Sequence, residues 1–81
     1  MIYNRLKTII SRMFQINAND IHINSRLYED LGINSLEMVD LFLEIEGEFD
    51  IDLFDEHVET IADLVDLISR GKELSDDEIS L

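Results

Sequence analysis

The sequence predicts an all-α fold, a small bundle of three longer helices and one short helix with a long structured loop between the first two longer helices. Apolar residues recur at helical spacing in three separate segments, and no segment shows a strand-like alternation or a proline-rich linker. With 81 residues, 46% of them hydrophobic, the chain can build only one small core. We expect one domain over residues 1–70 and a flexible acidic tail over residues 71–81.

The first longer helix is expected at the N-terminus. Its apolar residues occur at i, i+4, i+7, i+8, i+11 and i+12, and this stripe consists of Ile2, Leu6, Ile9, Ile10, Met13 and Phe14. Between residues 16 and 34 the spacing ends among asparagine, aspartate, serine and glycine, yet apolar residues continue to occur. A loop of this length with apolar anchors is expected to be pinned to the core.

The second longer helix is expected from the cap residue Asn34 to about Phe49. Asn34 can cap the amides of the first turn and Glu37 can reach back to the cap residue, which makes a capping box. The apolar row expected to face the core consists of Met38, Phe42, Ile45 and Phe49, widened by Leu41. A second apolar row on an adjoining face consists of Leu36, Val39 and Leu43.

A second capping box, formed by Thr60 and Asp63, indicates the start of the last longer helix. Its apolar positions are Ile61, Leu64, Val65 and Ile68, and Arg70 and Gly71 are expected to end it. Residues 55–60 form a short acidic stretch with room for one or two helical turns, and this is the short helix of the predicted bundle.

The charge is both large and uneven. The formal net charge is −13. Residues 1–28 have a balance of +3, whereas residues 29–81 have a balance of −16, and 12 acids without one basic residue occur between Glu37 and Asp66. Binding to nucleic acid or to an anionic membrane through phosphate neutralisation is therefore not expected, and a cationic partner is. No apolar run predicts a membrane span or a signal peptide, so we expect a cytoplasmic monomer.

The residues offer little for catalysis or metal binding. The chain has no cysteine, and its two histidines, His22 and His57, are far apart in sequence and are interpreted as surface or packing residues. Asp50 and Asp52 have the spacing of a calcium loop, but the later positions of that motif do not match. No catalytic residue and no specific metal site is predicted, and weak divalent-cation binding would only compensate charge.

One motif stands out, a serine at the turn where the long loop enters the acidic second longer helix. The segment reads Asp30-Leu31-Gly32-Ile33-Asn34-Ser35-Leu36-Glu37-Met38-Val39. Here the chain resembles the acyl carrier proteins, which carry a Leu-Gly-x-Asp-Ser-Leu signature at the start of the second helix of a four-helix bundle. The resemblance covers about residues 2–70 and includes Glu48-Phe49-Asp50, Asp55-Glu56 and the Thr60-Ile61 step.

The resemblance implies that Ser35, flanked by Asn34 and Leu36, carries covalent 4′-phosphopantetheine transferred from coenzyme A by a phosphopantetheinyl transferase. The thiol of this arm would hold acyl intermediates as thioesters for fatty-acid or polyketide-type biosynthesis, and the chain itself would not be an enzyme. The position suits a phosphodiester because helix N-termini attract anions. The plainer interpretation is a serine that only stabilises the start of the helix.

The acidic helix also implies a docking face for partner enzymes. The residues expected there are Leu36, Glu37, Val39, Asp40, Leu43, Glu44 and Glu46, extended by Glu56 and Glu59 of the short stretch. The partners implied are the transferase and acyl-transferring and ketosynthase-type enzymes with basic surfaces. Packing inside the bundle is the alternative for the apolar members, and a solvated face is the alternative for Glu56 and Glu59.

Three positions depart from the family pattern. Asn34 replaces the usual aspartate before the serine, Gly47 falls where many relatives carry an acid, and Phe54 replaces a common proline.

Two other interpretations stay open, an acidic helical interaction module of the same fold without a prosthetic group, and a peptidyl or aminoacyl carrier. The core residues of the three longer helices would line the gap in which such proteins shelter an acyl chain.

Overall fold

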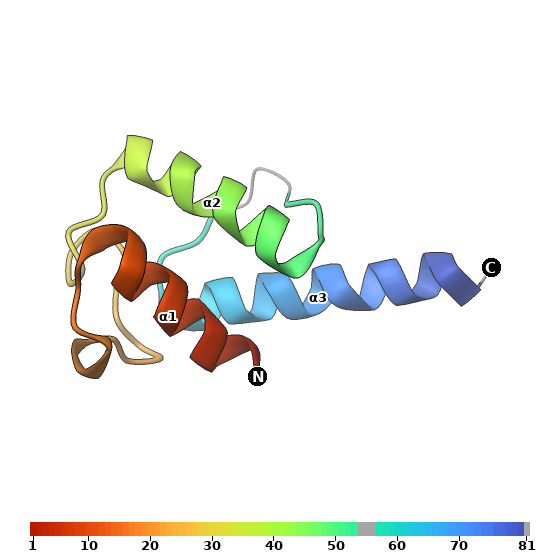
Figure 1. The fold of residues 1–81 in the computed structure, drawn as a ribbon, viewed down its shortest axis with the longest axis horizontal. Coiled ribbons are helices and arrows are strands. Elements are labelled where there is room, and N and C mark those ends of the chain that lie inside the picture. Colours follow the sequence, from red (N-terminus) through yellow and green to blue (C-terminus); the bar gives the residue numbers. More distant parts are fainter. Residues whose placement is uncertain (54–56, 81) are drawn as a thin grey trace.

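A computed structural model describes the backbone of residues 1–53 and 57–80, together with the side chains of these residues as far as Lys72. Its elements are α1 (Ile2–Phe14), the 3₁₀ helix η1 (Ala18–Asp20), α2 (Ser35–Phe49) and α3 (Ile61–Ser80). Figure 1 shows α2 lying above α1 and α3, and α1 packs against both of the other long helices. Within the described ranges there is no strand, which confirms the all-α prediction.

The apolar stripe of α1 faces the core as predicted. Leu6, Ile9 and Ile10 are buried, and the flanking members of the stripe, Ile2, Met13 and Phe14, are partly buried against the same core. The helix ends where Gln15 adopts a left-handed conformation, with φ of 57°. The N-terminal segment therefore supplies one side of the bundle.

The long loop between α1 and α2 is pinned to the rest of the molecule, again as predicted. Ile21, Leu27 and Ile33 are buried in the core. The backbone N–H of Leu27 donates to the carbonyl of Glu59 at 2.8 Å, and Arg26 and Thr60 form an isolated antiparallel bridge. The loop is thus joined to the segment that leads into α3, beside the start of α2.

Helix α2 begins with the predicted capping box and buries Met38, Leu41, Ile45 and Phe49. Phe42 is only partly buried, so the centre of the core-facing row is Leu41 and Phe42 lies at its edge. The apolar residues of α2 occur on two adjoining rows, and their spacing alone does not decide where the boundary between the rows falls.

The end of α2 lies against cations from both other long helices. Arg5 Nη2 donates to the carbonyl of Glu48 at 3.0 Å, and its guanidinium lies 4.5 Å from the centroid of the Phe49 ring. Lys72 Nζ donates to the carbonyl of Phe49 at 3.4 Å. Cations at a helix C-terminus satisfy its free carbonyls and complement the negative end of its dipole.

The predicted end of the last longer helix at Arg70 and Gly71 was wrong, because α3 continues to Ser80. Gly71 does not act as a helix-ending glycine. A Cβ at this position would lie 3.2 Å from Ile51 Cδ1, so the glycine lets α3 pass close to the chain that leaves α2. Figure 1 shows the C-terminal part of α3 extending past the ends of α1 and α2. The domain boundary after residue 70 stays a prediction.

Part of the stretch where the short helix was predicted lies outside the described residues. Residues 54–56 lie outside the described part of the chain, and His57, Val58 and Glu59 are not helical. Within residues 1–53 and 57–80, the short helix is η1, where the side chain of Asn17 accepts a hydrogen bond from the N–H of Asn19 and so favours a tight turn. No helix in the described ranges is both long enough and apolar enough to cross a membrane.

Candidate functional site

Ser35 is the first residue of α2, and its side chain is exposed. The turn before it is held from two sides. Gly32 has φ of +70°, which a residue with a Cβ rarely adopts, and its N–H donates to the carbonyl of Tyr28 at 3.1 Å. Ile33 is buried, and its N–H donates to the carbonyl of Leu27 at 3.0 Å. The serine is therefore presented to solvent from an anchored turn.

Asn34, rather than Ser35, caps the helix. Asn34 Oδ1 accepts a hydrogen bond from the N–H of Glu37 at 2.8 Å, and Glu37 Oε1 accepts one from the N–H of Asn34 at 2.9 Å. Among the described residues, no hydrogen bond involves the Ser35 hydroxyl. The interpretation of Ser35 as a residue that only stabilises the turn therefore lacks the contact it needs.

The start of α2 suits a phosphate ester on this serine. The N–H groups of Ser35 and Leu36 belong to the first turn, where a helix has no carbonyl to accept them. They point outward with the positive end of the helix dipole, an arrangement that favours negative charge. Asn34 adds no charge of its own beside the phosphate.

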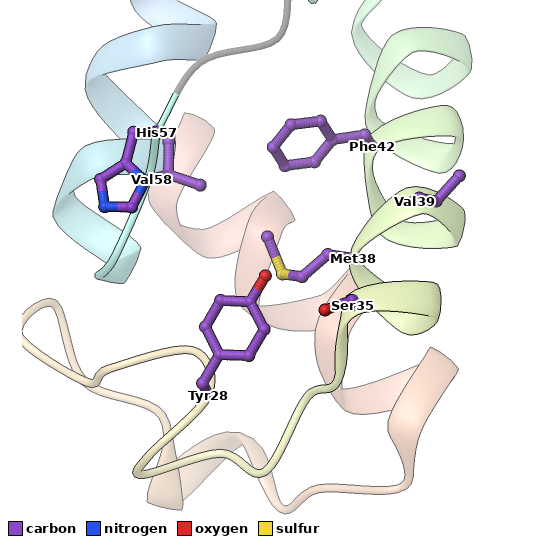
Figure 2. A pocket seen from close by; sticks show the side chains of 7 residues that line it. All are labelled: Tyr28, Ser35, Met38, Val39, Phe42, His57 and Val58. Carbon is purple, nitrogen blue, oxygen red and sulfur yellow. The ribbon is translucent and has the colours of Figure 1, made fainter.

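A pocket of about 510 Å³ opens beside Ser35. Its lining residues are Tyr28, Ser35, Met38, Val39, Phe42, His57 and Val58. Figure 2 shows the α2 residues on one side of the pocket, Tyr28 rising from the loop below, and His57 and Val58 on the side opposite Phe42. The site thus combines three segments, the loop before α2, α2 itself and the stretch before α3.

The sequence analysis did not predict this pocket, although the spacing of its α2 residues indicates that they share a face. Met38, Val39 and Phe42 follow Ser35 at i+3, i+4 and i+7, so helical spacing places them on the serine's side of α2. Tyr28 and His57 left no such signal, because loop residues reach the site only through the tertiary fold. His57 was predicted to be a surface or packing residue; its side chain is exposed at the rim of the pocket.

The second apolar row of α2 is exposed. The exposed fractions are 79% for Leu36, 57% for Val39 and 61% for Leu43. Asp40, which follows Val39, and Glu44, which follows Leu43, are also exposed. We call these five residues the docking face. The exposure of its apolar members contradicts the alternative of packing inside the bundle, and their role in docking stays a prediction.

Other acids expected on this face are engaged elsewhere or lie outside it. Glu46 is partly buried, and its Oε2 accepts a hydrogen bond from the N–H of Leu53 at 2.9 Å. The Glu37 carboxylate serves the capping box. Glu59 is exposed beside His57, with 3.4 Å between Oε1 and the imidazole Nε2, whereas Glu56 falls outside the described residues.

Arg26 and Asp30 brace the loop that leads to the site. Asp30 Oδ2 accepts a hydrogen bond from the N–H of Arg26 at 2.8 Å, and the guanidinium of Arg26 also donates to this carboxylate. The backbone bond and the guanidinium lower the pKa of Asp30 below its usual value. The described part of the chain contains no group of three or more histidine, aspartate or glutamate residues that could hold a metal ion.

Comparison with known proteins agrees with this geometry. A family model described as a phosphopantetheine attachment site matches residues 4–68. The acyl carrier protein of Clostridium acetobutylicum is 35% identical over 72 residues, which cover 89% of this chain and 94% of the relative. The acyl carrier protein of Thermotoga maritima is 32% identical over 68 residues, which cover 84% of each chain. That of onion yellows phytoplasma is 30% identical over 74 residues, covering 88% and 97%.

Proposed function

The chain belongs to the acyl carrier protein family and carries 4′-phosphopantetheine covalently, and from this premise we propose that Ser35 is the attachment residue. The observation that carries the proposal is the exposed Ser35 hydroxyl at the first position of α2, where Asn34 already caps the helix. A phosphodiester on Ser35 meets unpaired backbone N–H groups and the positive end of the helix dipole. These backbone groups would stabilise the negative charge of the ester without a basic side chain from α2.

The protein acts as a carrier and its partners supply the catalysis. When attached, the arm provides a thiol that binds acyl groups as thioesters, and the chain has no cysteine that would compete for them. The residues of the chain hold the serine on its anchored turn through the buried Ile33 and the capping box of Asn34 and Glu37. The cargo is an intermediate of fatty-acid or polyketide-type biosynthesis.

The docking face is where the transferase and the acyl-transferring or ketosynthase-type enzymes bind. Its apolar side chains Leu36, Val39 and Leu43 give a partner surface to bury. Asp40 and Glu44 attract basic surfaces and accelerate association. Binding is therefore fast, weak and sensitive to salt. Glu56 and Glu59 remain proposed extensions of this face.

Intact-mass spectrometry after incubation with coenzyme A and a broad-specificity phosphopantetheinyl transferase tests the attachment residue. The wild type should gain one phosphopantetheine adduct and Ser35→Ala none. Ser69→Ala, which removes a partly buried serine of α3, is the matched control and should be modified like the wild type. A wild type without an adduct, or an adduct on Ser35→Ala, contradicts the proposal.

Asn34 favours a second candidate, an acidic interaction module of the same fold. The family's usual aspartate is absent at this position. Asn34→Asp keeps the cap, since both residues cap helices about equally well, and restores the charge. Three results together would establish the interaction module. The wild type is not modified, Asn34→Asp is modified, and a basic protein binds the unmodified wild type in a salt-sensitive manner.

A peptidyl or aminoacyl carrier is the nearer alternative. The five acids and the absence of basic residues in α2 favour an acyl carrier, because peptidyl carriers usually have a less acidic helix at this place. The thioester found on the protein isolated from cells distinguishes the two. An aminoacyl or peptidyl group there would replace the acyl assignment.

A further inference from the structure

The pocket beside Ser35 has walls of two kinds. Met38, Val39, Phe42 and Val58 form an apolar surface, whereas Tyr28 and His57 bring polar groups from the opposite segments. At about 510 Å³ it has the size of a small-molecule pocket, in which a mainly apolar lining carries a few polar groups that orient the ligand. A pure hydrocarbon would cover these polar groups without satisfying them, at a cost in desolvation.

The backbone around Tyr28 is anchored by hydrogen bonds. Its carbonyl accepts the N–H of Gly32, and the carbonyl of Arg26 accepts the N–H groups of Asp30 and Leu31 at 3.0 and 3.1 Å. The neighbouring Leu27 is fully buried, and its N–H bonds the carbonyl of Glu59 in the segment that carries His57 and Val58. A backbone hydrogen bond therefore joins the loop that carries Tyr28 to the segment that carries His57 and Val58.

The hydroxyl of Tyr28 has no hydrogen-bond partner among the described residues. Tyr3, by contrast, donates from its hydroxyl to the carbonyl of Ile21 at 3.4 Å. In the ranges that the structure describes, no protein atom forms a hydrogen bond with the Tyr28 hydroxyl, and 47% of the residue is exposed. His57 Nε2 already lies 3.4 Å from Glu59 Oε1. Tyr28 is thus the polar group at the pocket best able to bind a ligand.

We propose that the pocket is a resting site for the phosphopantetheine arm and that the Tyr28 hydroxyl accepts a hydrogen bond from an amide N–H of the arm. The proposal rests on attachment at Ser35. The arm has the matching chemistry, because it carries apolar methyl and methylene groups as well as amides. Since Ser35 itself lines the pocket, the tethered arm is present there at a high effective concentration, of the order of millimolar or more. Weak contacts then suffice to populate the docked state.

Hydrogen exchange of the arm tests this role. The wild type, Tyr28→Phe and the control Tyr3→Phe are loaded from coenzyme A labelled with ¹⁵N in its pantetheine amides, and exchange is followed by NMR without any acyl group. In the wild type, an arm amide should exchange more slowly than in free labelled pantetheine. Tyr28→Phe keeps the ring and removes one hydrogen bond, so the docked-to-free ratio should fall about fivefold. Tyr3→Phe should leave this ratio unchanged.

Each remaining outcome overturns the proposal, and the failures are distinguishable. Exchange at the rate of free pantetheine in the loaded wild type means that the arm does not dock. An unchanged ratio in Tyr28→Phe means that another group binds it, and protection that requires an acyl group assigns the pocket to the cargo. These results leave attachment at Ser35 intact, whereas a wild type that gains no arm overturns both proposals.

Discussion

At the scale of single residues, Asp63 shows how an exposed carboxylate can organise the start of a helix. Its Oδ2 accepts hydrogen bonds from the N–H of Glu59 at 2.9 Å and of Thr60 at 3.1 Å, while Thr60 Oγ1 accepts one from the N–H of Asp63. The backbone N–H of Glu59 first, and that of Thr60 next, lower the pKa of Asp63 below its usual value. The folded protein therefore favours the charged carboxylate.

The stabilisation by Asp63 should depend on pH in a defined direction. Because the pKa is lowered in the folded state, the contribution is fully present above the unfolded value of about 3.9 and is lost as pH falls through the folded value. At neutral pH, Asp63→Asn should have a free energy of unfolding about 0.5 kcal/mol below that of Asp40→Asn, which removes one acid without these hydrogen bonds.

Urea unfolding of both variants and the wild type at pH 7 and at several values below 4 measures this difference. Asp40→Asn is the necessary control because removing any acid also relieves repulsion in this chain. The gap between the two variants should close as the pH falls. A gap that is the same at all pH values would show that the charge of Asp63 does not contribute.

At the scale of elements, the glycines separate helix propensity from backbone geometry. Gly47 lies inside α2, and a Cβ added there would meet no atom within 4 Å, so Gly47→Ala should stabilise the protein by about 0.5–1 kcal/mol. At Gly32, with φ of +70°, alanine should destabilise the protein by about 1–2 kcal/mol. Thermal unfolding should move by about 4–8 °C per kcal/mol, upward for the first variant and downward for the second. Shifts of the same sign would contradict the interpretation.

The parts of each element that depend on neighbouring residues could be predicted from the sequence. The stripe of α1 and both capping boxes require only side chains three or four positions apart, and the structure contains them. The end of α3 could not be predicted, because Gly71 is explained by its approach to Ile51, twenty residues away in sequence. The residues of the site likewise fall into those that could be predicted from their neighbours and those that could not. Ser35 and its turn were visible locally, whereas Tyr28 joins the pocket only through the packed loop.

At the scale of the whole molecule, two cations lie at the C-terminal end of α2, where they reduce the repulsion among its carboxylates. Arg5 pairs with Glu48, with 3.2 Å between Nη2 and Oε1, and Lys72 binds the carbonyl of Phe49 at the same end of α2. The other end of α2 carries the docking face and has no basic residue on the helix. Asp40 and Glu44 of the docking face therefore have no basic neighbour on α2 itself.

This arrangement predicts that salt stabilises the fold. Twelve acids without a basic residue occur between Glu37 and Asp66, and raising the ionic strength from about 0.01 to 0.15 M shortens the screening length from about 30 to 8 Å. Salt also weakens the Arg5–Glu48 pair, but an exposed pair contributes only about 0–1 kcal/mol, so relief of repulsion decides the sign. The melting temperature should rise with NaCl, and with millimolar Mg²⁺ or Ca²⁺, which bind the folded acidic surface.

Variants of opposite charge test whether repulsion is the cause. Asp40→Asn with Glu44→Gln removes two acids one helical turn apart, so this double variant should melt higher than the wild type at low salt and respond less to NaCl. Lys7→Gln removes a cation from α1 and should melt lower and respond more. Equal salt responses in all three proteins would show that salt acts through something other than the charge on α2. A wild-type melting temperature that stays flat or falls with salt would remove repulsion as a significant cost of this fold.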